Sequence, residues 1–175
     1  MEQADLATRI KAVTELRGTF TLRSGLIATT YFDKYRFEAN PELLGEVAAA
    51  MTLLIPSRTE VLAGLEMGGI PIVTAMSLRS GLPAAFVRKE AKTYGTCRLA
   101  EGADTDGKAV LVVEDVVTTG GQLLISIADL RERGANIDYA ICAIDRGQGG
   151  RQSLAAIGVT LISLFSQDDQ GQWVS

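Results

Sequence analysis

The chain has 175 residues, a net charge of −4 and no histidine. A chain of this length is expected to form one domain, residues 1–175, that buries roughly 70% of its unfolded surface without a disulfide or structural metal. The acidic balance argues against a nucleic-acid-binding protein that works by overall electrostatics, so any anion site has to be built locally.

The cysteines and the hydropathy pattern point to the cytoplasm. Cys97 and Cys142 lie far apart in sequence with no CxxC pair, so neither a zinc site nor a disulfide framework is expected. The N-terminus is charged and lacks an apolar signal core, and the longest uncharged run, 152–167, is broken by Gly158. We therefore expect neither an export signal nor a membrane span.

The first forty residues predict a helix and a hairpin. Apolar residues in 4–17 recur at helical spacing, and Gly18 is expected to end this helix. The alternating residues that follow predict two short strands joined at Ser24-Gly25. An isolated arginine such as Arg23 usually lies on the surface, and an aromatic pair such as Tyr31-Phe32 usually lies in the core. Because all three residues are close to the predicted turn, they could instead form a site in which a ring stacks on a planar ligand and the arginine binds an anion.

The next segment predicts helices alternating with strands. Asn40 as N-cap, Pro41 at the first helical position and Glu42 in the first turn predict a helix start. The elements expected after this helix are a strand over 60–63, a glycine-rich turn over 64–71, a helix over 71–79 and a strand over 84–87. The glycines of the turn permit the backbone to approach a ligand closely.

Residues 88–107 differ from the rest. The stretch 88–98 holds four cations against one acid and has no sustained apolar period. A connection of about twenty residues without internal packing is unusual in a compact domain and is either functional or disordered. A solvated charged loop is the plain alternative; a mobile lid that brings positive charge onto a bound polyphosphate fits better, because a closing segment can exclude water.

The rest of the chain is organised around 110–121. Val110–Val113 is typical of a strand buried on both faces, and Glu114-Asp115 follow it where open α/β sheets bind ligands. Thr118-Thr119 supply hydroxyls, Gly120-Gly121 can take positive φ, and a helix predicted over 122–133 begins behind this phosphate-binding loop.

A Walker B strand is the main alternative for this stretch, because it too is an apolar run ending in carboxylates. It requires an upstream phosphate loop, and the nearest candidate is 102–109. That segment has Ala109 where Ser or Thr must reach the magnesium, and Asp104 and Asp106 would repel a phosphate. We treat the match as a coincidence.

The last third repeats the alternation. Gly134 is expected to cap the central helix, and a strand over 138–144 ends at Asp145-Arg146 and a glycine-rich turn. A short helix closed by Gly158 and a strand over 159–165 complete the chain. The repeated β-α-β units predict an α/β fold with a doubly wound, mainly parallel sheet.

With these pieces in place, nearly the whole chain resembles the orotate phosphoribosyltransferases, a family of type I phosphoribosyltransferases. The matching segments are Phe20–Gly25 with Tyr31–Asp33, Gly69–Pro71, Arg88–Lys92 with Tyr94-Gly95, Val112–Gly121, and Asp145-Arg146. The resemblance implies a type I phosphoribosyltransferase fold with a small N-terminal hood (about 1–40) on a core (about 41–175). It also implies a homodimer whose catalytic loop reaches the partner's active site.

The implied reaction is the transfer of a phosphoribosyl group from phosphoribosyl diphosphate (PRPP) to orotate, with Mg²⁺ as cofactor, giving orotidine 5'-monophosphate in pyrimidine biosynthesis. The protein must then neutralise a leaving polyanion and tolerate a growing cation at the ribose. The implied catalytic residues are Arg88, Lys89, Lys92, Tyr94 and Asp115. The implied PRPP-binding residues are Arg23, Arg88, Lys89, Lys92, Glu114, Asp115, Val116, Val117, Thr118, Thr119, Gly120, Gly121 and Gln122. The implied orotate-binding residues are Tyr31, Phe32, Thr118 and Arg146. Magnesium is expected to be coordinated by the diphosphate and water, and not by a full set of protein ligands.

Two positions depart from the family pattern. Tyr94 stands where many members have histidine, so no imidazole can act as the acid, although a phenol can still donate a hydrogen bond. Gly68 stands where some members have lysine, which puts more of the charge neutralisation on the loop. Two rivals stay open: a phosphoribosyltransferase for another nucleobase, and a non-catalytic PRPP-sensing regulator, which would need a nucleic-acid surface.

Overall fold

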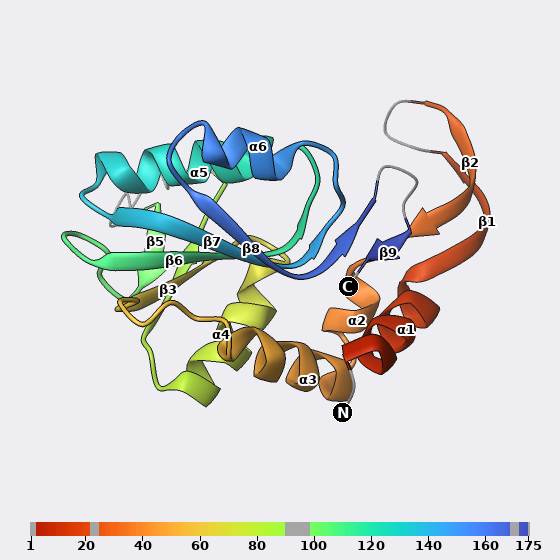
Figure 1. The fold of residues 1–175 in the computed structure, drawn as a ribbon, viewed down its shortest axis with the longest axis horizontal. Coiled ribbons are helices and arrows are strands. Elements are labelled where there is room, and N and C mark those ends of the chain that lie inside the picture. The colour runs from red at the N-terminus through yellow and green to blue at the C-terminus, as the bar shows by residue number, and fades with distance from the viewer. Residues whose placement is uncertain (1–2, 22–24, 90–98, 169–171, 175) are drawn as a thin grey trace.

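A seven-stranded sheet forms the centre of the computed structural model, which describes residues 3–21, 25–89, 99–168 and 172–174 (Figure 1). Its strand order is β5-β4-β3-β6-β7-β8-β9. The five inner strands are parallel, and β5 and β9 pair antiparallel at the two edges. The strands are β3 (Val61–Leu65), β4 (Ala84–Val87), β5 (Ala100–Gly102), β6 (Ala109–Val117), β7 (Asn136–Asp145), β8 (Thr160–Gln167) and β9 (Trp173–Val174). The predicted doubly wound, mainly parallel sheet is confirmed.

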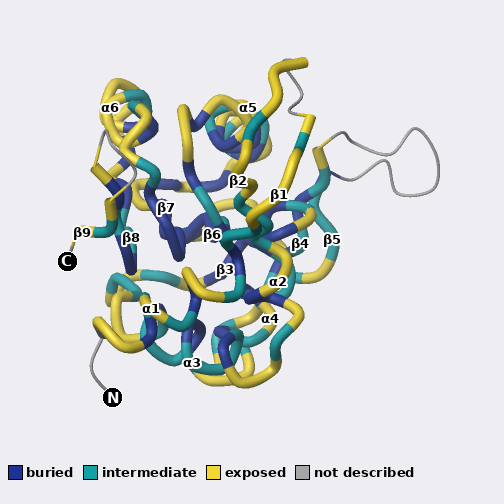
Figure 2. The backbone as a smooth tube through the Cα atoms, turned by 90° about the vertical axis from the view of Figure 1, so that its right-hand side faces the viewer, coloured by how far each residue is buried: buried dark blue, intermediate teal, exposed yellow. Residues whose placement is uncertain are grey.

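Helices cover both faces of this sheet (Figure 1). One face carries α1 (Gln3–Thr14), α3 (Pro41–Thr52) and α4 (Gly69–Ser80), and the other carries α5 (Gly121–Glu132) and α6 (Gly150–Ala155). Because successive side chains of a strand point to opposite faces, Val110 and Val112 join the core under α5, while Leu111 and Val113 join the core under α3 and α4. Figure 2 shows the resulting buried centre between exposed outer layers. Burial on both faces explains the unbroken apolar run of β6.

The N-terminal hood is built from an antiparallel hairpin of β1 (Glu15–Thr21) and β2 (Ile27–Phe32), followed by the short helix α2 (Tyr35–Glu38). The hairpin projects from the body of the molecule (Figure 1). The prediction that the first helix runs to Arg17 and ends at Gly18 was wrong, because both residues lie in β1. The helix stops at Thr14, whose carbonyl accepts a hydrogen bond from Asp33 N at 2.8 Å, so strand pairing replaces helical bonding from this point.

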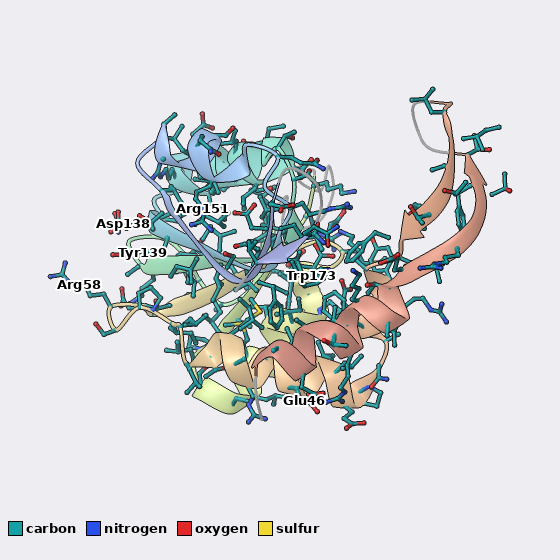
Figure 3. All side chains as sticks on the ribbon, turned by 45° about the vertical axis from the view of Figure 1, so that its right-hand side comes forward. Glu46, Arg58, Asp138, Tyr139, Arg151 and Trp173 are labelled. Atoms are coloured by element: carbon teal, nitrogen blue, oxygen red, sulfur yellow. The ribbon has the colours of Figure 1, made fainter. Side chains whose placement is uncertain are left out.

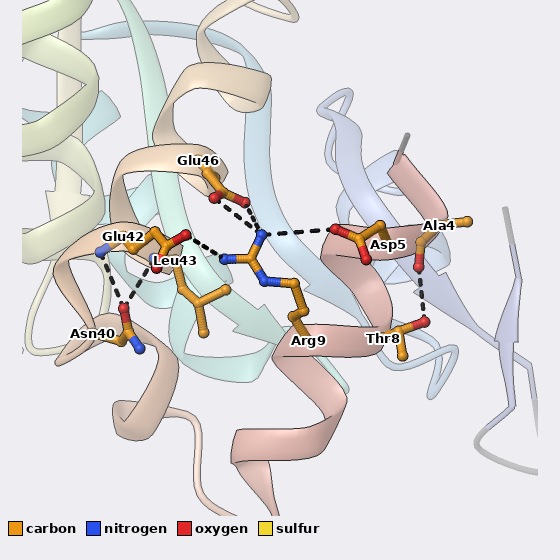
Figure 4. Close-up of polar contacts among 8 residues, drawn as sticks. All are labelled: Ala4, Asp5, Thr8, Arg9, Asn40, Glu42, Leu43 and Glu46. Carbon is orange, nitrogen blue, oxygen red and sulfur yellow. Dashed lines mark hydrogen bonds and ion pairs between the residues drawn. The ribbon is translucent and has the colours of Figure 1, made fainter. Parts of the chain in front are cut away.

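Two polar features attach the N-terminal segment to the core (Figure 4). Arg9 of α1 reaches α3, with its Nη1 2.8 Å from Glu46 Oε2 and its Nη2 3.1 Å from Glu42 Oε1. The predicted cap of α3 is confirmed, because Asn40 Oδ1 accepts hydrogen bonds from Glu42 N at 3.0 Å and Leu43 N at 3.2 Å. The contacts of Arg9 hold α1 against α3, and the cap of Asn40 fixes the start of α3.

Two other expectations need correction. Residues 88–107 were expected to be an unpacked connection, but Leu99 is buried and β5 pairs with β4; residues 90–98 lie outside the described part of the chain. The central strand was expected to end before Glu114-Asp115, whereas β6 continues to Val117 because its pairing with β7 persists as far as Asp145. Both carboxylates therefore belong to the strand. Within the described residues, no helix is both long and apolar enough to cross a membrane.

Candidate active site

The carboxyl ends of the parallel strands bring the predicted site segments to one edge of the sheet. Val113 of β6 lies beside Gly64 of β3, and Leu65 lies beside Val87 of β4. On the other side, Val117 pairs with Asp145. The glycine turn after β3, Arg88 after β4, the phosphate-binding loop after β6 and Arg146 after β7 therefore share this edge, as expected for ligand sites in open α/β sheets.

The predicted phosphate-binding loop leads directly into α5. Thr118 and Thr119 are exposed, and Gly120 takes φ +79° as the N-cap of α5 without a side-chain cap. The loop and the first turn line a cavity of about 160 Å³; its lining residues are Glu114, Val116, Val117, Thr118, Thr119, Gly120, Gly121, Gln122 and Leu123. A helix N-terminus with backbone N–H groups and two hydroxyls is suited to hold a phosphate.

Gly150, at the start of α6, supports this loop from behind. Its N–H donates to Thr118 O at 3.0 Å, and a Cβ at this position would lie 2.5 Å from Val117 Cγ1 and 2.6 Å from Thr118 O. Only a glycine lets the two turns approach this closely. The glycine-rich turn after Arg146 thus shapes the phosphate-binding loop through backbone contact.

The two carboxylates of β6 lie in different surroundings. Asp115 is fully buried, and its Oδ1 accepts a hydrogen bond from Val116 N at 2.6 Å. Lys34, between β2 and α2, forms an ion pair with it, with Nζ 2.7 Å from Oδ2 and 3.0 Å from Oδ1. The buried carboxyl of Glu38 in α2 is also within hydrogen-bonding reach of Asp115. The sequence analysis missed Lys34 and Glu38, because no motif or spacing relates them to a residue some eighty positions later.

These contacts shift the pKa values of the cluster in opposite directions. Burial, followed by the hydrogen bond and charge of Asp115, raises the pKa of Glu38 to about 9. Burial and the same neighbour raise the pKa of Glu114. Burial alone would raise the pKa of Asp115, but hydrogen bonds with Glu114 and Glu38 and the charge of Lys34 lower it overall. Asp115 is therefore the carboxylate that stays ionised.

The glycine turn after β3 runs against this cluster. A Cβ at Gly68 would collide with Asp115 Oδ2, and one at Gly69 would collide with Val113 O. Gly64 likewise has no room for a side chain, because Val73 and Gly69 O lie against it. The absence of lysine at position 68, noted from the sequence, thus has a steric basis in this chain: the space is taken by the side chain of Asp115.

Arg146 lies on the other side of the phosphate-binding loop, since its N–H donates to Val117 O at 2.9 Å. Its guanidinium carbon lies 5.1 Å from the ring centroid of Phe32, and its Nε donates to Gln167 Oε1 at 3.1 Å. Burial lowers the pKa of Arg146, which still leaves it charged. The structure therefore brings Phe32 and Arg146 into contact, while their roles in orotate binding stay predictions.

Tyr31 is separated from this pair. Its ring packs against Phe20 at a centroid distance of 5.5 Å and is largely exposed, because neighbouring residues of β2 face opposite sides. Of the two rings, only that of Phe32 lies beside Arg146, and the roles of both in orotate binding stay predictions.

The cations of the predicted catalytic loop are only partly within the described residues. Arg88 follows β4 and is fixed by its N–H to Leu99 O at 2.9 Å, with its Nε 3.8 Å from Glu101 Oε1. Lys89 is exposed. Arg23, Lys92 and Tyr94 lie outside the described residues, so their roles stay predictions.

Comparisons with known proteins agree with this geometry. Residues 36–168 match the phosphoribosyl transferase domain family. The chain is 53% identical over 156 residues to an orotate phosphoribosyltransferase of Nocardioides sp., covering 89% of this chain and 87% of that protein. It is 46% identical over 152 residues to an orotate phosphoribosyltransferase of Methanocella arvoryzae, with 87% of each chain covered.

Solved structures extend the agreement to three dimensions. The orotate phosphoribosyltransferase of Mycobacterium tuberculosis H37Rv in complex with PRPP has a TM-score of 0.81 and 28% identity, covering 94% of this chain and 95% of that one. The fold and the related sequences therefore indicate the same family. The chain belongs to the orotate phosphoribosyltransferase family, within the phosphoribosyl transferases.

Proposed function

We propose that this chain transfers the phosphoribosyl group of PRPP to orotate, releasing diphosphate and giving orotidine 5'-monophosphate, in the cytoplasm. One observation carries the proposal: a buried carboxylate, a hydroxyl-bearing glycine loop at a helix N-terminus, and an arginine held against an aromatic ring share one edge of the sheet. These three groups match the ribose, the 5-phosphate and the anionic base of the two substrates.

The phosphate-binding loop holds the 5-phosphate. The backbone N–H groups of Gly121 and Gln122 and the hydroxyls of Thr118 and Thr119 supply donors, and the α5 dipole favours the negative charge. Fixing the phosphate orients the C1 carbon of the sugar, which is the main contribution this loop makes to the rate. Val116 and Val117 contribute the backbone that leads into the loop.

The sugar and the base bind on the two sides of the phosphate-binding loop. Glu114 and Asp115 bind the ribose hydroxyls, and the ionised Asp115 favours the positive charge that develops at the ring as diphosphate leaves. Arg146 forms a two-pronged contact with the orotate carboxylate, and Phe32 packs on the pyrimidine. The bond between C1 and the diphosphate oxygen breaks as the base nitrogen forms its bond to C1, and the N–H proton of the base passes to the departing diphosphate or to water. No protein nucleophile is needed.

Positive charge on the departing diphosphate comes from the segment after β4. Arg88 and Lys89 stand at the correct edge of the sheet, and Lys92, Tyr94 and Arg23 complete this set in the proposal. The loop acts across a homodimer, reaching the active site of the partner. The hood (about 1–40) and the core (about 41–175) form one domain that carries these groups.

Magnesium enters with PRPP. Mg²⁺ prefers oxygen ligands and keeps several waters, so oxygens of the diphosphate and water would be its ligands, and the bound ion would supply charge that offsets that of the leaving group. Among the described residues, no group of three or more carboxylate, cysteine or histidine side chains could hold a metal ion. Chelation with EDTA is therefore expected to abolish turnover and leave the unfolding temperature of the free protein unchanged, measured by calorimetry.

The deciding experiment follows the loss of orotate absorbance when Mg²⁺ and PRPP are added to the pure protein. Consumption of orotate with release of one diphosphate per orotate supports the proposal. Turnover of uracil or hypoxanthine but not orotate would assign the chain to another base. Mixing a Lys89→Ala variant with a Glu114→Gln variant tests the shared loop, since activity regained in the mixture requires sites built from two chains.

A further inference from the structure

The hood contributes two charged side chains to the buried end of β6. We propose that Lys34 and Glu38 are positioning residues for the sugar-binding carboxylate: Lys34 holds Asp115 by an ion pair, and Glu38 donates an O–H hydrogen bond to it. This inference rests on the proposed function of Asp115 and adds two residues to the sugar site, both from the segment that links the hood to the core.

The ion pair of Lys34 is built to hold one geometry. The Nζ atom contacts both oxygens of Asp115, at 2.7 and 3.0 Å, and the Lys34 side chain is two-thirds buried. The same ammonium lies 5.4 Å from the centroid of the Tyr35 ring. Because Asp115 is completely buried, removing its partner would leave a charge without compensation, which is far more costly than losing an exposed pair.

The hydrogen bond from Glu38 follows from the surroundings of two buried oxygens. Glu38 Oε1 has no hydrogen-bond partner among the described residues, and Asp115 Oδ2 has no partner there besides the ion-paired Lys34 Nζ at 2.7 Å. The two carboxyl groups are within hydrogen-bonding reach of each other. Two ionised carboxylates would repel, whereas a carboxylic acid facing a carboxylate satisfies both oxygens with a single proton.

The surrounding charges assign this proton to Glu38. The groups that face it are Asp115 and Glu114 on β6 and Lys34 before α2. Burial and Asp115 raise the pKa of Glu38 to about 9, while Lys34 and the hydrogen bonds lower the pKa of Asp115. At neutral pH the folded protein therefore keeps a proton on Glu38 that the unfolded chain, with a pKa of 4.5 for this group, has already lost.

The arrangement serves the sugar site in two ways. It keeps Asp115 ionised and in one rotamer, ready to accept a hydrogen bond from a ribose hydroxyl. It also couples the hood to the site, because Lys34 lies two residues after Phe32, which stacks on Arg146. One short segment of the hood thus touches both the sugar-binding and the base-binding ends of the site.

Stability measured against pH tests the Glu38 proton without any substrate. Because the folded pKa is raised, the stabilisation from this proton is complete below pH 4.5 and is lost as the pH rises toward about 9. The unfolding temperature of the wild type should fall between about pH 6 and about pH 9, with Glu114 contributing in the same direction. Glu38→Gln, whose amide donates at every pH, should at least halve that fall.

Glu132→Gln is the matched control, because it makes the same change at an exposed carboxyl. Glu132 is the last residue of α5, and the phosphate-binding loop lies at the opposite end of that helix. The unfolding temperature of Glu132→Gln should fall between about pH 6 and about pH 9 by as much as that of the wild type. A Glu38→Gln protein that loses as much stability with pH as the wild type overturns the assignment of the proton. This result would be independent of whether the enzyme turns over orotate.

Binding of PRPP tests Lys34. Lys34→Met, which keeps length and removes charge, should weaken PRPP binding and raise the KM for PRPP about tenfold or more, while the KM for orotate changes less than the KM for PRPP. Lys34→Arg, which restores the charge, should recover part of the loss. PRPP affinity in Lys34→Met within threefold of the wild type, measured by calorimetry, overturns the role of Lys34. Failure of the wild type to bind PRPP would instead reject the proposed function.

Discussion

The two halves of the site at the end of β6 are built in different ways. The phosphate-binding loop, Thr118–Gln122, is neutral and local: consecutive residues supply hydroxyls, a positive-φ glycine and a helix N-terminus. The acidic end, Glu114-Asp115, is charged and assembled from a distance, since Lys34 and Glu38 reach it from the hood. The first is shaped by backbone geometry and the second by paired side chains in a buried setting.

The two halves are therefore sensitive to different changes. A backbone site depends on what packs behind it, so small additions of volume damage it. A buried charged site depends on its counter-charges, so the loss of one partner damages it.

Asp115→Asn should have the largest effect on catalysis. It removes the charge that favours the developing cation, and kcat/KM should fall by about 10² to 10³, or roughly 2.7–4 kcal/mol. Steady-state kinetics with PRPP measures it. Asp138→Asn, at an exposed position away from the hairpin (Figure 3), is the control. Equal activity in the two variants would show that the acidic end is not the sugar site.

Arg146→Lys should have the second largest effect, on the KM for orotate. Lysine cannot keep the contact with Gln167 and also present two parallel donors, so the KM for orotate should rise by about tenfold to a hundredfold, while PRPP affinity stays close to that of the wild type. Arg58→Lys, at an exposed position (Figure 3), serves as the control. An increase confined to the KM for PRPP would reassign Arg146 to the phosphate-binding half.

Gly150→Ala tests the backbone half. The added methyl group would lie against Val117 and Thr118 O, so unfolding should become easier by about 1–3 kcal/mol and PRPP affinity should fall. Gly45→Ala is the matched control, because a Cβ there meets no atom within 4 Å and an alanine inside α3 should stabilise by about 0.5–1 kcal/mol. Denaturant unfolding that gives the same sign for both variants would contradict this account of the loop.

Asn40→Ala should have the smallest effect. It removes the cap of α3 and is expected to cost about 1 kcal/mol of unfolding free energy. Within the described part of the chain, no hydrogen bond joins Asn40 to either half of the site, so kcat and both KM values should stay near those of the wild type. A selective change in the KM for PRPP would mean that α3 controls the position of Lys34 and Glu38.

The sequence supported most of the fold because its signals are local. The apolar run of β6 and the Asn40-Pro41 cap each act over a few residues, and both predictions were confirmed. The expectation that the glycines after the strands admit a ligand stays a prediction. The errors arose where tertiary pairing overrides local preference. Residues 15–17 continue a helical pattern but pair with β2, and Glu114-Asp115 break an apolar pattern but stay in β6 because β7 holds them there.

The α/β class and the order of the elements can be predicted from the sequence, because periodicity and turn chemistry are properties of neighbouring residues. The side chains that meet from distant parts of the chain emerge only when the chain is folded. Lys34 and Glu38 meet Asp115, and Phe32 meets Arg146, because the hood packs over the carboxyl edge of the sheet. Ion pairs and shared protons depend on distance and burial, and neither quantity is encoded by spacing along the chain.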